Sequence, residues 1–324
     1  MGRGRTRDGA RAAKRKSIAG LGSLAEPPSA VAAEPVALTL NESDVCDAKV
    51  APPLSEPAEV RQVDLSDKRW LAADAAVVGA AHLRANPPKP CQDATLADSS
   101  RRPLVVLADG AGSAAVSHVG AAAVVAGVRR LCRTLESDLA AALDAEIGPA
   151  GLGESIARRI VAHTRGILDD LADIHLRGPE DFRCTLLVWL VGRQRALWLK
   201  VGDGALVAEA DGACLCVGPA GKGEFANQTC FIGPSLEDRQ WAWGEIDATR
   251  ISGLAAMSDG AAERLVASDL SRVSPAVSKL LRGVAESEIG RREIFGLLAE
   301  AEFWKGTSGD DKSLGLVARA LSPA

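Results

Sequence analysis

Four short apolar runs between residues 183 and 217 follow one another with only glycine-containing turns between them. The runs cover residues 183–191, 196–201, 206–210 and 214–217, and the turns read GRQ, GDG and DG. Runs of this length, bounded by such turns, are typical of β-strands joined by hairpins. The stretch therefore predicts an antiparallel meander, and the rest of the chain must be able to pack on it.

Segments of two kinds surround this stretch. The helical spacing of apolar residues predicts helices at 114–135, at 154–171 and within 261–303. Further short apolar runs predict strands at 73–81, 93–96, 104–108, 241–246, 251–258 and 314–318. Three prolines predict a loop at 82–92. Because strands and helices come in separate groups, the order predicts an α+β fold in which helices cover a pair of sheets.

The composition excludes several classes of protein. The chain has 324 residues and a formal net charge of -4, which is too small to suggest a nucleic-acid partner. No apolar run approaches the roughly 18 residues that span a bilayer, so no membrane segment is expected. Seven cysteines without a CxxC pair are typical of a reduced, cytoplasmic protein.

The N-terminal fifth of the chain differs from the remainder. Residues 1–66 are rich in alanine, proline, serine and charge, with little periodicity. This composition predicts a disordered tail or linker. Its basic first 16 residues are interpreted as a solubilising segment, and the alternative is that they contact an acidic partner. A single folded domain is predicted at 67–322.

Five aspartates share a similar setting. Asp109, Asp259 and either Asp310 or Asp311 each lie at one end of a predicted strand, beside a turn with glycine or serine. Asp93 follows the proline-rich loop, and Asp203 lies in the turn KVGDGAL. Hard divalent cations such as Mg²⁺ and Mn²⁺ prefer oxygen ligands. The set therefore predicts a metal site, in which two ions about 3.5–4 Å apart could share one carboxylate and activate one water.

The segments that carry these aspartates occur in the order of a known family. They read CQDA (91–94), LADGAGS (107–113), CTLLVWLV…LKVGDG (184–204), MSDG (257–260) and GDDKS (309–313). Over residues 72–319 the chain resembles the metal-dependent Ser/Thr phosphatases of the 2C type, the PPM family, and in particular its shorter bacterial branch. The resemblance implies a four-layer α-β-β-α sandwich with two antiparallel sheets, a phosphatase domain at 67–322 and a role in bacterial signalling.

The resemblance also implies roles for individual residues. Asp109 would bridge two Mn²⁺ or Mg²⁺ ions, and the Gly110 carbonyl would bind one of them. Asp259 and Asp310 would complete the first site, and Asp93 would hold the second ion through a water. The water that bridges the metals would attack phosphorus in phosphoserine or phosphothreonine of a protein substrate, which makes Asp93 and Asp109 the expected catalytic residues.

Two positions depart from the family pattern. Many eukaryotic members have a histidine where this chain has Ala111, and the usual spacing of a phosphate-binding arginine is interrupted by PPKP. Arg84 or Lys89 is expected to hold the phosphate instead.

Asp203, with Asp259, is expected to bind a weaker third ion. The alternative is a phosphatase-like protein that binds a phosphoprotein partner without turnover, and a partner kinase is expected only by analogy.

A second motif overlaps the same turn. Residues 110–115 read GAGSAA, which fits the GxGxxA pattern of dinucleotide-binding folds. Such a fold needs a second strand ending in an acidic residue about 20 positions later. The predicted helix continues through that position instead. A dinucleotide site is therefore disfavoured, and the chain also has neither a GxSxG nor an HExxH motif.

Overall fold

The structure is a computed structural model that describes residues 69–219 and 229–321. The tail predicted at 1–66 lies outside these residues, so the domain boundaries at 66 and 67–322 stay predictions. Residues 220–228, part of the glycine- and polar-rich stretch before the strand predicted at 241–246, also lie outside them.

In the described residues, ten strands form two antiparallel sheets of five. The first sheet has the order β1 (Trp70–Val77), β10 (Lys312–Arg319), β9 (Ile251–Met257), β6 (Ala205–Ala210) and β7 (Ala213–Val217). The second has the order β2 (Asp93–Asp98), β3 (Leu104–Asp109), β4 (Leu186–Val191), β5 (Arg195–Val201) and β8 (Trp241–Asp247). The pairing predicted between residues 93–96 and 104–108 is confirmed as β2 and β3.

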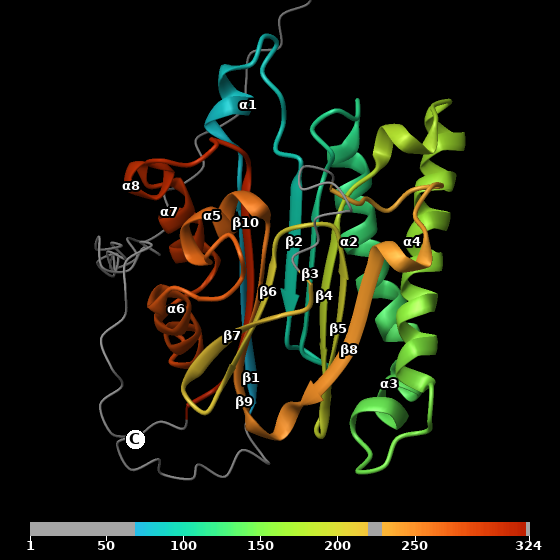
Figure 1. Cartoon of the computed structure of the whole chain (residues 1–324), viewed down its shortest axis with the longest axis vertical. Helices are drawn as coiled ribbons and strands as arrows, with labels where there is room; N and C mark the ends of the chain where they lie inside the picture. The colour runs from blue at the N-terminus through green and yellow to red at the C-terminus, as the bar shows by residue number, and fades with distance from the viewer. Residues whose placement is uncertain (1–68, 220–228, 322–324) are drawn as a thin grey trace, which may run out of the picture. The chain divides into compact units, whose positions relative to one another are not determined.

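Helices cover the outer faces of both sheets (Figure 1). The second sheet is covered by α2 (Ser117–Thr134), α3 (Glu136–Leu143) and α4 (Leu152–His175). The first is covered by α5 (Asp259–Leu265), α6 (Pro275–Ala285), α7 (Arg291–Ala299) and α8 (Ala301–Trp304). The predicted four-layer α-β-β-α sandwich is thus confirmed. None of the helices in the described part of the chain is both long and apolar enough to cross a membrane.

Strand β4 lies at the centre of the packing. All six of its residues, LLVWLV, are buried, because one face meets helices α2 and α4 and the other meets the opposite sheet. A strand that is buried on both faces reads as a continuous apolar run rather than an alternating one. Its Trp189 has no exposed surface, and the indole Nε1 donates a hydrogen bond of 3.0 Å to the carbonyl of Ala255 on β9. This bond links the two sheets directly.

The predicted meander at 183–217 is wrong in its pairing. Strands β4 and β5 pair in one sheet, whereas β6 and β7 pair in the other. The turn 202–204 therefore carries the chain across the sandwich instead of closing a hairpin. Its two glycines have positive φ values, 91° at Gly202 and 73° at Gly204. A GDG sequence is compatible with a hairpin turn and with a turn that crosses between sheets. The two differ only in which strand the following segment pairs with.

Other element boundaries differ from the predictions in local ways. The strand predicted at 73–81 begins at Trp70 and ends at Val77. The short helix α1 (Ala80–Arg84) occupies the start of the loop predicted at 82–92. The first proline of that loop is Pro87, so the preceding residues remain free to form a helical turn. Helix α3 was not predicted.

Candidate metal centre

Asp93 and Asp109 are cross-strand partners on β2 and β3, at the first residue of one strand and the last of the other. The Asp93 side chain is buried, and neither of its carboxylate oxygens has a hydrogen-bond partner among the described residues. Burial raises the pKa of Asp93 to about 7, and the nearby hydroxyls of Ser313 and Ser258 offset part of this effect without forming hydrogen bonds to the carboxylate. An unpaired buried carboxylate is costly unless a cation is bound.

Asp109 is held in place by the chain that leads into β4. Its N–H donates to Thr185 Oγ1 at 2.9 Å, and the N–H of Thr185 donates to the Asp109 carbonyl at 2.8 Å. The pKa of Asp109 is raised well above its usual value, first by burial and then by four neighbouring negative charges. These charges belong to Asp93, Asp259, Asp310 and Asp203. The structure thus places the five predicted aspartates close enough together for the charges of four of them to raise the pKa of Asp109.

Asp259 and Asp203 come from two connecting segments that are far apart in the sequence. Asp259 is the first residue of α5, directly after β9 and Ser258, and it accepts the N–H of Gly260 at 2.6 Å. Burial raises its pKa to about 6, and the charges of Asp203 and Asp310 add to the rise. Asp203 lies in the turn between the sheets, where Thr229 Oγ1 donates to its carboxylate at 2.6 Å. The crossover that contradicts the predicted meander is therefore what carries Asp203 to this edge.

The structure separates the two aspartates that the sequence left as alternatives. The Asp310 side chain is half exposed, and its charge acts on both Asp109 and Asp259. Asp311 is 2% exposed, and its two carboxylate oxygens accept the N–H groups of Gly79 and Gln92. Asp310 thus faces the other carboxylates, whereas Asp311 connects the start of β10 to the segments beside β1 and β2.

One buried cation lies next to this cluster and was missed in the sequence. Lys312 has no exposed surface; its Nζ donates to the Gly260 carbonyl at 2.9 Å and lies 4.2 Å from the Trp304 ring centroid. Burial lowers the pKa of Lys312, and the charges of nearby acidic residues, Asp259 among them, oppose this shift. A lysine directly after two aspartates in GDDKS was the available signal. A single ammonium does not balance five carboxylates.

Mg²⁺ and Mn²⁺ are the metals that the resemblance implies for this donor set. The set consists of carboxylate oxygens from five chain segments, and both oxygens of Asp93 are buried without partners among the described residues. Mg²⁺ and Mn²⁺ prefer such ligands and retain several waters, which leaves room for a substrate oxygen. The residues present therefore fit these ions.

The turn after Asp109 is fixed by backbone contacts. The N–H of Gly110 donates to the Gln92 carbonyl at 3.1 Å, and that of Ala111 donates to the Arg183 carbonyl at 3.1 Å. A Cβ on Gly110 would lie 2.8 Å from Ser117 Oγ, so the close approach of helix α2 requires glycine. Ala111 is 2% exposed, so this position offers no side chain to a substrate.

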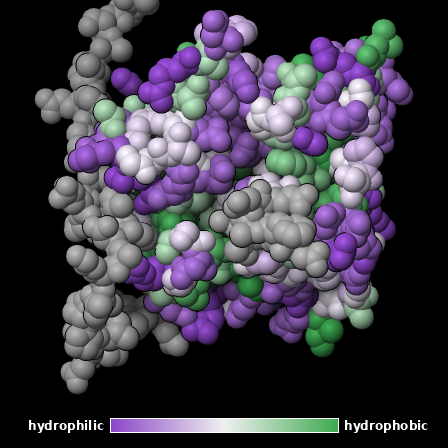
Figure 2. Space-filling view, turned by 45° about the horizontal axis from the view of Figure 1, so that its top comes forward, coloured by the Kyte–Doolittle hydropathy of each residue, from purple (hydrophilic) through white to green (hydrophobic). Residues whose placement is uncertain are grey.

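Three basic residues lie around the cluster. Arg84 is exposed, with its guanidinium close to Gly309, and the exposed Lys89 donates through Nζ to the Gly112 carbonyl at 3.2 Å. Arg183 was not considered in the sequence. Its Nη2 donates to Ser113 Oγ at 2.8 Å, and its Nε is buried without a hydrogen-bond partner in the described chain. Figure 2, which brings this edge of the sheets forward, shows mostly hydrophilic residues with some apolar ones between them.

A hollow of about 480 Å³ lies beside Arg183. Its lining includes Thr229, whose hydroxyl contacts Asp203, and Phe231, whose ring centroid lies 5.6 Å from the Arg183 guanidinium carbon. The remaining lining residues are Glu180, Cys230, Ile232, Gly233, Pro234, Ser235, Leu236 and Gln240. The hollow thus joins a basic and an aromatic side chain to the acidic edge.

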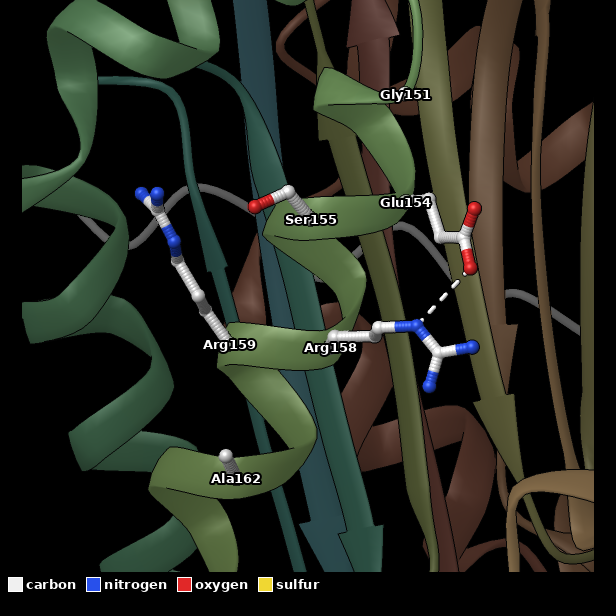
Figure 3. A pocket seen from close by; sticks show the side chains of 6 residues that line it. All are labelled: Gly151, Glu154, Ser155, Arg158, Arg159 and Ala162. Carbon is white, nitrogen blue, oxygen red and sulfur yellow. Dashed lines mark hydrogen bonds and ion pairs between the residues drawn. The ribbon is translucent and has the colours of Figure 1, made fainter.

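A second hollow, of about 440 Å³, lies on helix α4 (Figure 3). Arg158 and Arg159 point to different sides there, and both form ion pairs with acidic residues. Arg158 contacts Glu154 at 3.0 Å, and Arg159 contacts Asp138 at 2.5 Å. No residue of the acidic cluster lines this hollow. We therefore do not assign it to the candidate site.

Two facing sheets between helix layers, with clustered carboxylates at one edge, define a class of metal-dependent α-β-β-α proteins. The protein phosphatase 2C family model matches residues 78–298 of this chain. The chain therefore belongs to the protein phosphatase 2C family and is a protein serine/threonine phosphatase, and phosphatases of this family use Mn²⁺ or Mg²⁺. No curated protein sequence matches the chain significantly.

Solved structures share this fold at low identity. The catalytic domain of the serine/threonine protein phosphatase PstP in complex with two manganese ions is 16% identical, with a TM-score of 0.52 over 78% of this chain and 99% of that chain. Stp1 from Staphylococcus aureus is 15% identical, with a TM-score of 0.52 over 82% and 100%. PppA from Pseudomonas aeruginosa is 16% identical, with a TM-score of 0.51 over 77% and 97%. At this identity the likeness shows the fold.

Proposed function

We propose that this phosphatase hydrolyses phosphoserine and phosphothreonine esters at a binuclear Mn²⁺ or Mg²⁺ site. One observation carries the proposal. Four carboxylates from other segments of the chain raise the pKa of Asp109 through their charges, and both oxygens of buried Asp93 lack a partner among the described residues. Such an arrangement is stable only if cations offset the charge. The two manganese ions in the PstP complex support the same number of ions here.

The ligands are assigned by their place in the cluster. Asp109 lies within the influence of the other four carboxylates, which supports its role as the shared ligand, with the Gly110 carbonyl beside it. Asp259 and Asp310 complete the first site, and Asp93 serves the second. Two such ions supply an activated water as the nucleophile and stabilise negative charge on the phosphoryl oxygens. Asp203, with Asp259, is proposed to hold a weaker third ion.

The protein's own residues hold the substrate. Arg84 and Lys89 stay proposed phosphate ligands, since both are exposed and reach segments next to the aspartates. Arg183 is proposed to hold the peptide that flanks the phosphorylated residue, because a guanidinium offers a fork of donors for carbonyl and carboxylate oxygens. The hollow beside Arg183 and Phe231 is proposed to take the peptide that flanks the phosphorylated residue.

The cellular setting is part of the proposal. The substrate is a phosphoprotein, and a kinase that makes it is the expected partner in bacterial signalling. The six described cysteines are free thiols, which is consistent with the reducing cytoplasm.

The test is a phosphatase assay with the full chain and Mn²⁺. We expect turnover of p-nitrophenyl phosphate and of phosphoserine and phosphothreonine peptides that is lost in Asp109→Asn. Turnover no higher than that of the variant would contradict the proposal. If the wild-type protein then still bound a phosphopeptide, the alternative of partner binding without turnover would replace it.

A further inference from the structure

His82 lies against the acidic cluster, although neither the sequence pattern nor the family match assigns it a role. It comes from helix α1 and is nine-tenths buried. Its Nδ1 lies 3.0 Å from Asp311 Oδ2, and its Nε2 lies 3.7 Å from Asp310 Oδ1. In residues 69–219 and 229–321, these three side chains form the one group of histidine, cysteine and acidic residues whose donor atoms all lie within 4.8 Å of one another.

Hydrogen bonding does not account for the position of the imidazole. Nδ1 is buried and makes no hydrogen bond in the described chain, because its direction toward Asp311 is unsuitable despite the short distance. The separation of 3.7 Å between Nε2 and Asp310 is too long for such a bond. A nearly buried ring thus lies within ion-pair distance of two carboxylates, while its Nδ1 makes no hydrogen bond to the described residues.

Asp311 is held rigidly on the other side of this group. Its Oδ1 accepts the N–H of Gly79, and its Oδ2 accepts the N–H of Gln92. Each oxygen keeps a second lone pair that these bonds do not use. Backbone donors that orient a ligating carboxylate are typical of the outer shell of a metal site.

The distances fit a single ion. Donor atoms about 2.0–2.2 Å from one ion, at angles of about 90–120°, lie roughly 3.0–3.6 Å apart. The separations of 3.0 Å from Nδ1 to Asp311 and 3.7 Å from Nε2 to Asp310 start from different ring nitrogens, of which one ion takes one. With one donor atom from each side chain, the three atoms all lie within 4.8 Å of one another, so small side-chain rotations bring them into this range. We propose that His82, Asp310 and Asp311 together bind a transition-metal ion, Mn²⁺ or Zn²⁺, through one nitrogen and two carboxylates.

The nitrogen ligand would give the site its selectivity. Mg²⁺ demands oxygen ligands in nearly ideal octahedral geometry, whereas Mn²⁺ and Zn²⁺ accept imidazole. The inference rests on the proposed function only through Asp310, which both sites would share. It predicts that at least one ion bound by this chain carries a histidine ligand.

Pulsed electron paramagnetic resonance of the full chain loaded with Mn²⁺ tests this directly. A coordinated imidazole produces a ¹⁴N coupling on the Mn²⁺ signal, which carboxylates and water do not. We expect this coupling in the wild-type protein and in Asp109→Asn, and its loss in both His82→Ala and His82→Gln. The matched control is His163→Gln, since His163 is exposed on helix α4 and should leave the coupling unchanged.

Equilibrium titration with Mn²⁺ gives a second readout. The His82 variants should bind one equivalent at least about 10-fold more weakly, with a melting curve that shows they remain folded. A wild-type signal without ¹⁴N coupling, or a coupling that persists in the His82 variants, would overturn the inference. If Mn²⁺ binds and phosphopeptides are hydrolysed without ¹⁴N coupling, only this inference fails. If the coupling depends on His82 but nothing is hydrolysed, only the proposed function fails.

Discussion

Asp93 and Asp109 stand directly opposite each other on two neighbouring antiparallel strands. Like charges at such paired positions destabilise a sheet, and burial increases the cost. Burial raises the pKa of both residues, and the charge of Asp93 contributes to the rise at Asp109. The metal-free fold therefore carries an electrostatic strain at its acidic edge that a bound cation would relieve.

The stability of the metal-free protein should fall as the pH rises from about 5.5 to 8. Asp93 has a pKa of about 7 in the fold against 3.8 in the unfolded chain, so between these values the folded state binds more protons. The free energy of unfolding therefore decreases through this window. In the presence of a chelator, we expect the Tm at pH 8 to be at least about 4 °C lower than at pH 5.5. This corresponds to a loss of about one to two kcal/mol in the free energy of unfolding. Asp93→Asn should flatten the profile; an equal slope in both proteins would contradict this cause.

Mn²⁺ should stabilise the fold through these same carboxylates. An ion at 100 times its dissociation constant adds about 2.7 kcal/mol when it binds only the folded state. We expect Mn²⁺ to raise the Tm of the wild-type protein and a chelator to reverse the rise. In Asp259→Asn and Asp310→Asn the rise should shrink and activity should fall more than about 100-fold, while the metal-free variants stay folded because repulsion is reduced. Unfolding of these variants without metal would make the aspartates structural instead.

Gly260 should not tolerate a side chain. A Cβ there would overlap the carbonyl oxygen of Asp311, and the displaced backbone would separate Asp259 from Asp310. We expect Gly260→Ala to cost about 1–3 kcal/mol in stability and to lower kcat. Gly166→Ala is the control, since no described residue outside the adjoining helix backbone comes within 4 Å of its Cβ, and alanine should stabilise helix α4 by up to about 1 kcal/mol. Equal melting temperatures for the two variants would refute the argument.

Arg183 should matter more for peptides than for small esters. It lines the hollow beside Phe231, and p-nitrophenyl phosphate has no flanking peptide that could occupy this hollow. We expect Arg183→Ala to raise KM for phosphopeptides about 10-fold, or about 1.4 kcal/mol, with a smaller change for p-nitrophenyl phosphate. Arg130→Ala, an exposed arginine on helix α2, serves as the control. An equal loss on both substrates would assign Arg183 to the phosphate itself, and no loss would remove it from the site.

Residues 1–66 should be dispensable for hydrolysis. Their composition favours a disordered tail, and the first strand of the described residues, β1, begins at Trp70. A truncated chain that starts at Asp67 should keep both its kcat and its Tm. Steady-state kinetics and thermal melts of the two forms test this, and a large loss in either quantity would place part of the tail in the working enzyme.

Local chemistry in the sequence was sufficient to predict the strands, most of the helices and which aspartates are candidate ligands. Alternation, apolar runs and turn residues act between near neighbours, so the strands around Asp93, Asp109 and Asp259 could be predicted with small boundary errors. The four layers followed from the order of these elements and from the family resemblance. The catalytic and metal-binding roles of the aspartates remain predictions.

Only the tertiary structure decided which segments meet. The turn at Asp203 fits a hairpin or a crossover equally well, and packing between the sheets selected the crossover. The hydrogen bonds from Gly79 and Gln92 turned Asp311 inward and left Asp310 toward the carboxylates. His82 reached the cluster because α1 forms before the prolines begin. Such contacts join residues far apart in the chain, so their free energy depends on packing that no local pattern encodes.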